Sequence, residues 1–209
     1  MEIQYFGGNC IQINTKEATL LIDDSLADLG GNSPMKAGDV ALYTKPHGNP
    51  AKAAKLLIDQ PGEYEVSNVS IQGIAARSHM EEEGQISATI FKLIADDVRV
   101  AIVGHIYPEL SDSQLEAIGM VDVLVVPVGG GGYTLDPVGA LNIIKKIEPK
   151  LIIPTHYSDN KLNYPVPQIE LDKVLAELAM EPQETTPKLK LKQQDLSTEG
   201  MRLIVLTRD

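Results

Sequence analysis

The chain has 209 residues, of which 43% are hydrophobic and 22% charged, and its formal net charge is −11 at pH 7. These values fit one globular domain over residues 1–209 and exclude a disordered chain. They also exclude a broad nucleic-acid surface, which needs clustered lysines and arginines, and a membrane span, which needs an apolar run of about 20 residues. The single cysteine, Cys10, and an N-terminus without signal-peptide character lead us to expect a cytoplasmic protein.

Short strands dominate the first half of the chain. Apolar alternation and apolar runs predict them, and turn residues such as Gly7-Gly8-Asn9 separate them. A helix is predicted over residues 51–58, because a proline at position 50 is tolerated at a first helical turn. The predicted strands are residues 2–6, 10–14, 19–23, 40–43, 62–66, 69–75, 87–94 and 98–103.

Strands and helices alternate in the second half. Ser111 and Asp136 are predicted N-caps of helices that reach residues 118 and 147, and an apolar stripe predicts a third helix over residues 168–180. Antiparallel strands followed by β-α-β units favour an α+β fold or a four-layer sandwich over a doubly wound sheet. The predicted strands are residues 121–126, 151–153, a half-exposed edge strand at 188–192, and 201–207, with a loop at 181–187.

All four histidines of the chain stand at or beside the end of an apolar run, at His47, His79, His105 and His156. Such runs are typical of buried strands, and their ends gather at one edge of a sheet. Imidazole is the commonest metal ligand in proteins. The set therefore favours a shared metal site, although a single histidine at a strand end would be unremarkable by itself.

A glycine-rich segment, residues 127–137, follows one buried strand and precedes a helix. Consecutive glycines let the backbone approach a ligand closely. The segment lacks the Gly-Lys-Ser/Thr ending of a phosphate loop, so it gives little support to nucleotide binding. A plain connection between strand and helix is the competing interpretation.

Four segments together resemble the metallo-β-lactamase fold superfamily: residues 1–13, Pro61-Gly62-Glu63-Tyr64-Glu65-Val66, the glycine-rich segment and Pro154-Thr155-His156-Tyr157. The resemblance covers nearly the whole chain and is greatest to small bacterial metal-dependent hydrolases related to ascorbate-phosphate lactonase. It implies an α+β fold, a four-layer αβ/βα sandwich of two mixed sheets with outer helices.

The same resemblance assigns the ligand positions. The family signature is H-x-H-x-D-H, and here Lys45 replaces its first His, His47 keeps the second, Asn49 replaces the Asp and Pro50 the third His. The later family ligands correspond to three residues of this chain: His79, His105 (at a position where the family has Asp) and His156. A two-metal centre is therefore not expected.

A single divalent metal is expected instead, zinc first, with manganese, iron or nickel as alternatives. His47, His79 and His105 would bind it, and His156 would be a fourth ligand or a proton donor. The other predicted site residues are Lys45 for an anionic substrate group, Asp23 or Asp24 to orient an imidazole, and Gly130, Gly131 and Tyr133 as a substrate loop.

Two functions remain open from the sequence. The first is a metal-dependent hydrolase with a reduced site that acts on a small anionic ester, lactone or phosphodiester. The second is a catalytically inactive relative without metal, which serves as a ligand-binding or protein-interaction module. A small molecule is the expected partner, nucleic acid and membranes are not, and homo-oligomer formation is left open.

Overall fold

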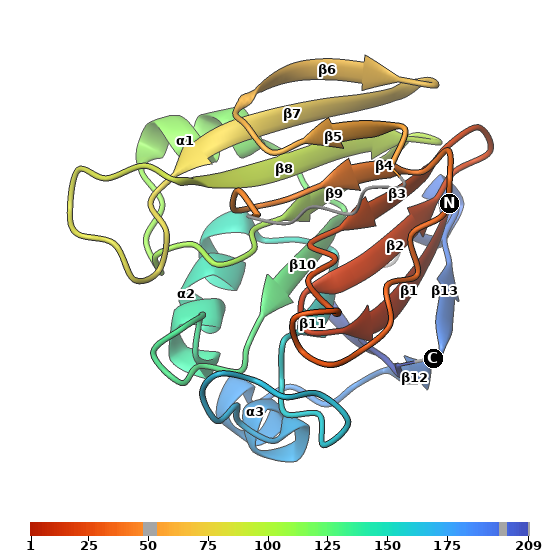
Figure 1. Ribbon diagram of the computed structural model, residues 1–209. Coiled ribbons are helices and arrows are strands. Elements are labelled where there is room, and N and C mark those ends of the chain that lie inside the picture. The colour runs from red at the N-terminus through yellow and green to blue at the C-terminus, as the bar shows by residue number, and fades with distance from the viewer. Residues whose placement is uncertain (48–53, 197–199, 209) are drawn as a thin grey trace.

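The computed structural model describes residues 1–47, 54–196 and 200–208, which form two mixed β-sheets packed face to face (Figure 1). In the six-stranded sheet, β1 to β3 are antiparallel, and β4 and β5 continue in parallel from β3. Its strands in spatial order are β13 (Lys188–Lys190), β1 (Glu2–Gly7), β2 (Cys10–Asn14), β3 (Thr19–Ile22), β4 (Val40–Leu42) and β5 (Leu56–Ile58).

The eight-stranded sheet has a parallel half and an antiparallel half. Its first five strands in spatial order run parallel to one another, and the hairpins from β9 to β6 are antiparallel. The strands in that order are β12 (Glu184–Thr186), β14 (Arg202–Leu206), β11 (Leu151–Thr155), β10 (Val123–Pro127), β9 (Val98–Ile102), β8 (Ala88–Ala95), β7 (Val69–Ala76) and β6 (Gly62–Val66).

The inner faces of the two sheets share one hydrophobic core. Along β1, buried residues alternate with half-buried ones, as expected for a strand with one covered face. Ile3 and Tyr5 of β1 belong to the same buried cluster as Phe91 of β8. Strands β10 and β11 are buried along their whole length, because both faces of their sheet are covered.

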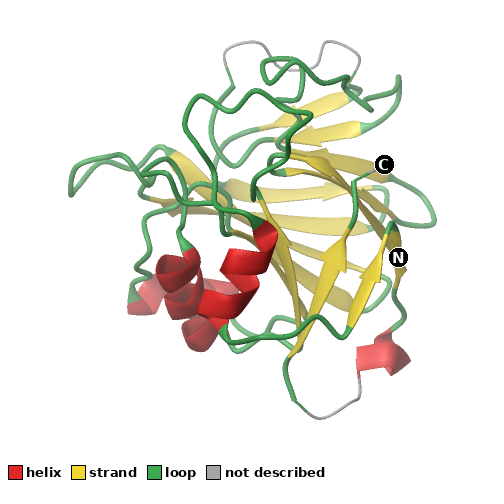
Figure 2. Cartoon of the chain, turned by 90° about the horizontal axis from the view of Figure 1, so that it is seen from below, coloured by secondary structure: helices red, strands yellow, loops and turns green. Residues whose placement is uncertain are grey.

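The helices α1 (Asp112–Ile118), α2 (Pro137–Ile147) and α3 (Leu171–Leu178) pack on the outer face of the eight-stranded sheet, and Figure 2 shows them gathered on one side of the sheets. Within the described residues, loop side chains such as Leu26 and Leu162 cover the outer face of the six-stranded sheet. The α+β sandwich of two mixed sheets is confirmed, with loop rather than helix forming this fourth layer. No helix in the described part of the chain is long and apolar enough to cross a membrane.

Local sequence signals explain the helix starts. Ser111 caps α1 and forms a capping box with Gln114, and the Asp136 side chain accepts a hydrogen bond from the Gly139 amide at the start of α2. Both predicted N-caps are confirmed.

Two predicted elements are wrong. The helix predicted over residues 51–58 is contradicted at Leu56–Ile58, which pair with β4 as strand β5, and residues 51–53 lie outside the described residues. The loop predicted over residues 181–187 contains strand β12, which pairs with β14. In both places a neighbouring strand offers backbone partners, which the local sequence pattern does not reveal.

The ends of the strands bring distant segments together at one edge. β9, β10 and β11 are parallel, so the turns that follow them lie side by side. The six-stranded sheet joins this edge at Thr44, which directly follows Tyr43 and β4. Its carbonyl oxygen accepts a hydrogen bond of 2.7 Å from the Thr89 amide.

Candidate metal centre

The site lies where β9 and β11 end. His105 is the third residue after β9, and His156 follows β11 directly. Their ring centroids are 4.8 Å apart, and the ring planes meet at 84°. The structure therefore brings two of the four predicted histidines into contact as a pair, His105 and His156.

His79 is the neighbour of His105 on the other side. An isolated antiparallel bridge between Ser78 and Ile106 places the two histidines opposite each other, and the His79 amide donates to the His105 carbonyl oxygen over 2.8 Å. Nδ1 of His79 lies 3.3 Å from the Ile106 carbonyl oxygen, which can only accept, so this nitrogen is the donor. His79 thus adds a third imidazole beside the pair.

The imidazoles of the pair are held neutral. Burial is the main cause that lowers the pKa of His156. Burial, followed by the repulsion that a protonated His156 would exert and by the charge of Lys45, holds the pKa of His105 well below its usual value. Nδ1 of His105 is buried and has no hydrogen-bond partner among the described residues. Nδ1 of His156 lies 3.0 Å from Oε1 of Gln168. Neutral imidazoles of this kind suit a divalent metal.

Lys45 follows β4 and approaches Ser78, the residue before His79. Its side chain is exposed, and Nζ lies 3.4 Å from the Ser78 hydroxyl oxygen. Its positive charge contributes to the low pKa of His105. An exposed cation whose hydrogen-bond partner here is a neutral hydroxyl can bind an anionic group of a ligand.

His47 is placed differently. Its Nε2 lies 2.8 Å from Oδ2 of Asp28, and its ring stacks on Tyr43 with a centroid distance of 5.2 Å. Asn49 and Pro50, which complete the predicted signature segment, lie outside the described residues. The role of His47 as a ligand stays a prediction.

The two predicted carboxylates, Asp23 and Asp24, accept hydrogen bonds from Thr44 and Ser33. Both oxygens of Asp23 accept hydrogen bonds from Thr44, at 2.6 Å from the amide and 2.7 Å from the hydroxyl. Burial raises the pKa of Asp23 to about 6 despite these bonds. Asp24 accepts a hydrogen bond from Ser33, and its Oδ1 is buried without a partner among the described residues.

Thr44 in turn packs on the residue before His105. Gly104 has a φ of +58°, and a Cβ built on it would lie 2.1 Å from the Thr44 hydroxyl oxygen. Only glycine accommodates both the backbone conformation and this close approach. Asp23 is therefore bonded to a residue that packs on Gly104, and the orientation of an imidazole by Asp23 or Asp24 stays a prediction.

The glycine-rich loop lies over the pair. Tyr133 contacts the His105 ring edge-on at a centroid distance of 4.8 Å, and Gly130 and Gly131 adopt φ values of +68° and +70°. A Cβ built on Gly129 would lie 1.8 Å from the His156 carbonyl oxygen. The close approach expected of this segment is thus made to the backbone of His156, at a glycine that was not among the predicted site residues.

Among the described residues, the site offers nitrogen donors to a metal ion, and the expectation of a single metal stays a prediction. An orphaned buried nitrogen on His105 and a second neutral imidazole 4.8 Å away supply two donors. In residues 1–47, 54–196 and 200–208, no group of three or more His, Cys, Asp or Glu side chains is arranged to hold a metal ion. His79 is the neighbouring imidazole available for a third position.

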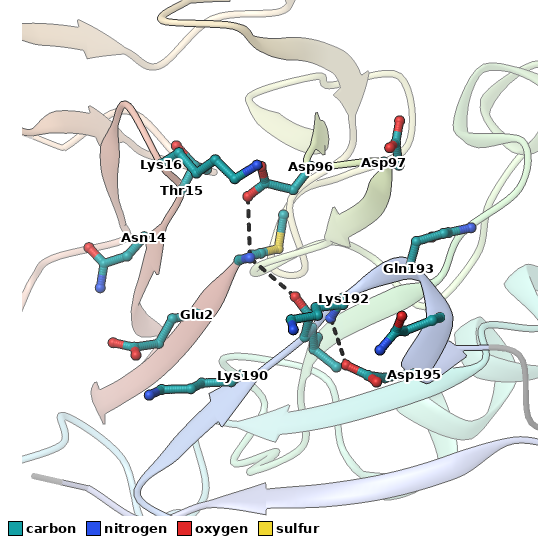
Figure 3. Close-up of a pocket in the computed structure, with 13 residues that line it drawn as sticks. Glu2, Asn14, Thr15, Lys16, Asp96, Asp97, Lys190, Lys192, Gln193 and Asp195 are labelled. Atoms are coloured by element: carbon teal, nitrogen blue, oxygen red, sulfur yellow. Dashed lines mark hydrogen bonds and ion pairs between the residues drawn. The ribbon is translucent and has the colours of Figure 1, made fainter.

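A separate cavity of about 870 Å³ lies at the opposite end of β9, beside the Asp96-Asp97 turn (Figure 3). Its polar groups pair with one another: the amino group of Met1 lies 3.2 Å from Oδ2 of Asp96, and the Lys192 amide donates to Asp195 over 2.8 Å. Charged groups of both signs line this cavity.

Gln168, Gly129 and Thr44 were missed by sequence reasoning. The glycine run predicted a close backbone approach, but it did not reveal that Gly129 approaches the backbone of His156. Gln168 reaches His156 from the loop before α3, and no sequence pattern marks it.

A sandwich of two mixed sheets with histidines at the strand-end edge defines a metallo-β-lactamase-like protein. Residues 2–156 match the model of the beta-lactamase superfamily domain, and the chain belongs to this family. The resemblance stated from the sequence is confirmed, while the altered signature stays a prediction.

Three comparisons describe its relatives. A UPF0173 protein of Pyrococcus abyssi is 27% identical over 180 residues, which cover 75% of this chain and 83% of the relative. A UPF0173 metal-dependent hydrolase of Salinibacter ruber is 26% identical over 211 residues, which cover 82% of this chain and 89% of the relative. The crystal structure of a proposed Zn-dependent hydrolase of the metallo-beta-lactamase superfamily from Thermotoga maritima matches with a TM-score of 0.75 and 25% identity, over 99% of this chain and 98% of that one.

Proposed function

We propose that the protein is a metal-dependent hydrolase with one divalent metal ion, bound by His105 and His156 with His79 beside them. The observation that carries this proposal is the contact of two neutral imidazoles at 4.8 Å, one of them with a buried nitrogen that has no partner among the described residues. Relatives named as metal-dependent and Zn-dependent hydrolases support it.

A bound metal would polarise a carbonyl or phosphoryl oxygen and lower the pKa of a water molecule. The residues of the chain supply the charge and the surface that would bind the substrate. Neutral imidazoles leave the positive charge of the ion uncompensated, and the Lys45 ammonium adds to it, so the site favours an anionic substrate. Tyr133, 36% exposed above His105, offers an aromatic surface to the substrate. The proposed substrates are small anionic esters, lactones or phosphodiesters, and zinc is the proposed metal.

A second function, ligand binding without metal or catalysis, is favoured by one observation. In the described residues the rings of His105 and His156 contact each other, and no group of three or more His, Cys, Asp or Glu side chains is arranged to hold a metal ion. The two functions differ in whether the pair binds a metal.

Zinc affinity of single variants tests the proposal. His105→Ala and His156→Ala remove one nitrogen each and should weaken zinc binding by about 10-fold or more. His47→Ala tests the predicted role of His47, which here contacts Asp28 and Tyr43: a similar loss would add it to the ligands, and an unchanged affinity would remove it from them. Unchanged zinc affinity in His105→Ala and His156→Ala would overturn the ligand assignment, and wild-type protein that binds no zinc would favour the second function.

Substrate class is tested separately. Wild-type protein loaded with zinc should hydrolyse anionic esters, lactones or phosphodiesters and lose this activity with a chelator. Lys45→Met should raise KM for anionic substrates more than for neutral ones, since it removes a cation beside the pair. An equal effect on both kinds would contradict the role of Lys45.

A further inference from the structure

Gln168 contacts His156 from the loop that precedes α3 (Leu171–Leu178). Its Oε1 lies 3.0 Å from Nδ1 of His156, and its Nε2 donates to the Val166 carbonyl oxygen over 3.0 Å. The side chain is partly buried. One amide thus touches both the histidine ring and a backbone acceptor.

The backbone contact fixes the direction of the amide. If the amide were turned over, Oε1 would face the Val166 carbonyl oxygen, and two acceptors would oppose each other. With Nε2 donating to Val166, the atom that faces His156 is an acceptor. The ring nitrogen Nδ1 must then be the donor, because Oε1 has no proton to give.

The glycine-rich loop holds Gln168 in this position. The Ile169 amide donates to the Gly129 carbonyl oxygen over 2.8 Å, which ties the residue after Gln168 to the loop. A Cβ on Gly129 would lie 2.4 Å from Oε1 of Gln168, so the amide fills the space that this glycine leaves. The ring of Tyr164 borders the other side of His156 at a centroid distance of 5.2 Å.

We infer that Gln168 is a positioning residue that fixes His156 with its proton on Nδ1 and its lone pair on Nε2. In a free neutral histidine the proton prefers Nε2, so the amide reverses the ordinary preference. Under the proposed function, this makes Nε2 of His156 the nitrogen that binds the metal. The tautomer itself does not depend on a metal.

The tautomer is measured by long-range ¹H–¹⁵N NMR of metal-free protein labelled at its histidines. The wild-type His156 ring should carry its proton on Nδ1. Gln168→Leu should lose this preference. Gln168→Glu loses the donor to Val166 but keeps an acceptor for Nδ1, and should retain the preference. Gln183→Leu is a matched control, since it makes the same change at an exposed position. A proton on Nε2 in the wild type, or an unchanged tautomer in Gln168→Leu, would overturn the inference.

Zinc affinity provides the second readout. Gln168→Leu should bind zinc about 10–100-fold more weakly than the wild type, as for other residues that orient a metal-binding histidine, with Gln168→Glu and Gln183→Leu near the wild-type value. If the wild type binds no zinc, the proposed function fails, while the Nδ1 tautomer would still support the role of Gln168. If zinc binds but the wild-type proton sits on Nε2, the inference alone fails. Should Gln168→Leu not fold, the tautomer of His156 measured in the wild type and in Gln168→Glu tests the inference.

Discussion

Substituting Gly129 by alanine should displace His156 and destabilise the protein. The added Cβ would lie 1.8 Å from the His156 carbonyl oxygen, 3.0 Å from its carbonyl carbon and 2.4 Å from Oε1 of Gln168. Backbone atoms cannot rotate away, so the turn that carries His156 must retreat by about 1 Å to reach the shortest distance that real Cβ contacts show.

The expected cost follows from this displacement. Overpacking of a tight site costs about 1–3 kcal/mol of unfolding free energy. A shift of about 1 Å at a reacting centre can cost about 100-fold in catalysis. Gly129→Ala should therefore lose stability by about 1–3 kcal/mol in urea denaturation and lose zinc affinity by about 10-fold or more.

Gly132→Ala provides the control within the same loop. A Cβ on Gly132 meets no atom within 4 Å, but its φ of +72° strains an alanine. It should cost about 1–2 kcal/mol of unfolding free energy and leave zinc affinity unchanged. If Gly129→Ala keeps both stability and zinc affinity, or if both variants lose affinity equally, the packing argument is refuted.

Two further predictions concern the support of the fold. Gly104→Ala would combine a φ of +58° with a Cβ 2.1 Å from the Thr44 hydroxyl oxygen. It should lower the unfolding free energy by about 3 kcal/mol or more, and a loss below about 1 kcal/mol would contradict this contact. Asp122 is buried and bonded to Arg99 and Lys150, and the Arg99 hydrogen bonds outweigh burial to lower its pKa to about 2. Because this pKa lies below the unfolded value of about 3.9, the ionised carboxylate contributes roughly 2 kcal/mol to the free energy of unfolding above pH 4. This contribution is lost as the pH falls towards 2. The difference in urea stability between wild type and Asp122→Asn should narrow over that range, and a constant difference would show that ionisation is not the cause.

The sequence predicted the strands well because their apolar runs are long and are bounded by glycine and aspartate turns. It failed at Leu56–Ile58 and at Glu184–Thr186, since each is a three-residue strand that depends on a partner distant in the chain. The meeting of His105 and His156 could be predicted, because parallel strands end at a common edge.

The surroundings of the pair could not be predicted in the same way. The contact between Gln168 and His156 depends on how one loop folds back over another, and the approach of Gly104 to Thr44 joins the two sheets. Neither of these two contacts produces a periodic pattern in the sequence. His47 follows β4 as expected, yet its contact with Asp28 is set by the path of the loop between β3 and β4.

The most direct test of the account is the metal-to-protein ratio, measured by elemental analysis of tag-free protein purified without chelators. We expect about one equivalent of a divalent metal in the wild type, and none in the double variant His105→Ala/His156→Ala. About two equivalents would contradict the single-metal centre. No metal in the wild type even after soaking with zinc, or undiminished metal in the double variant, would contradict the assignment of the pair as its ligands.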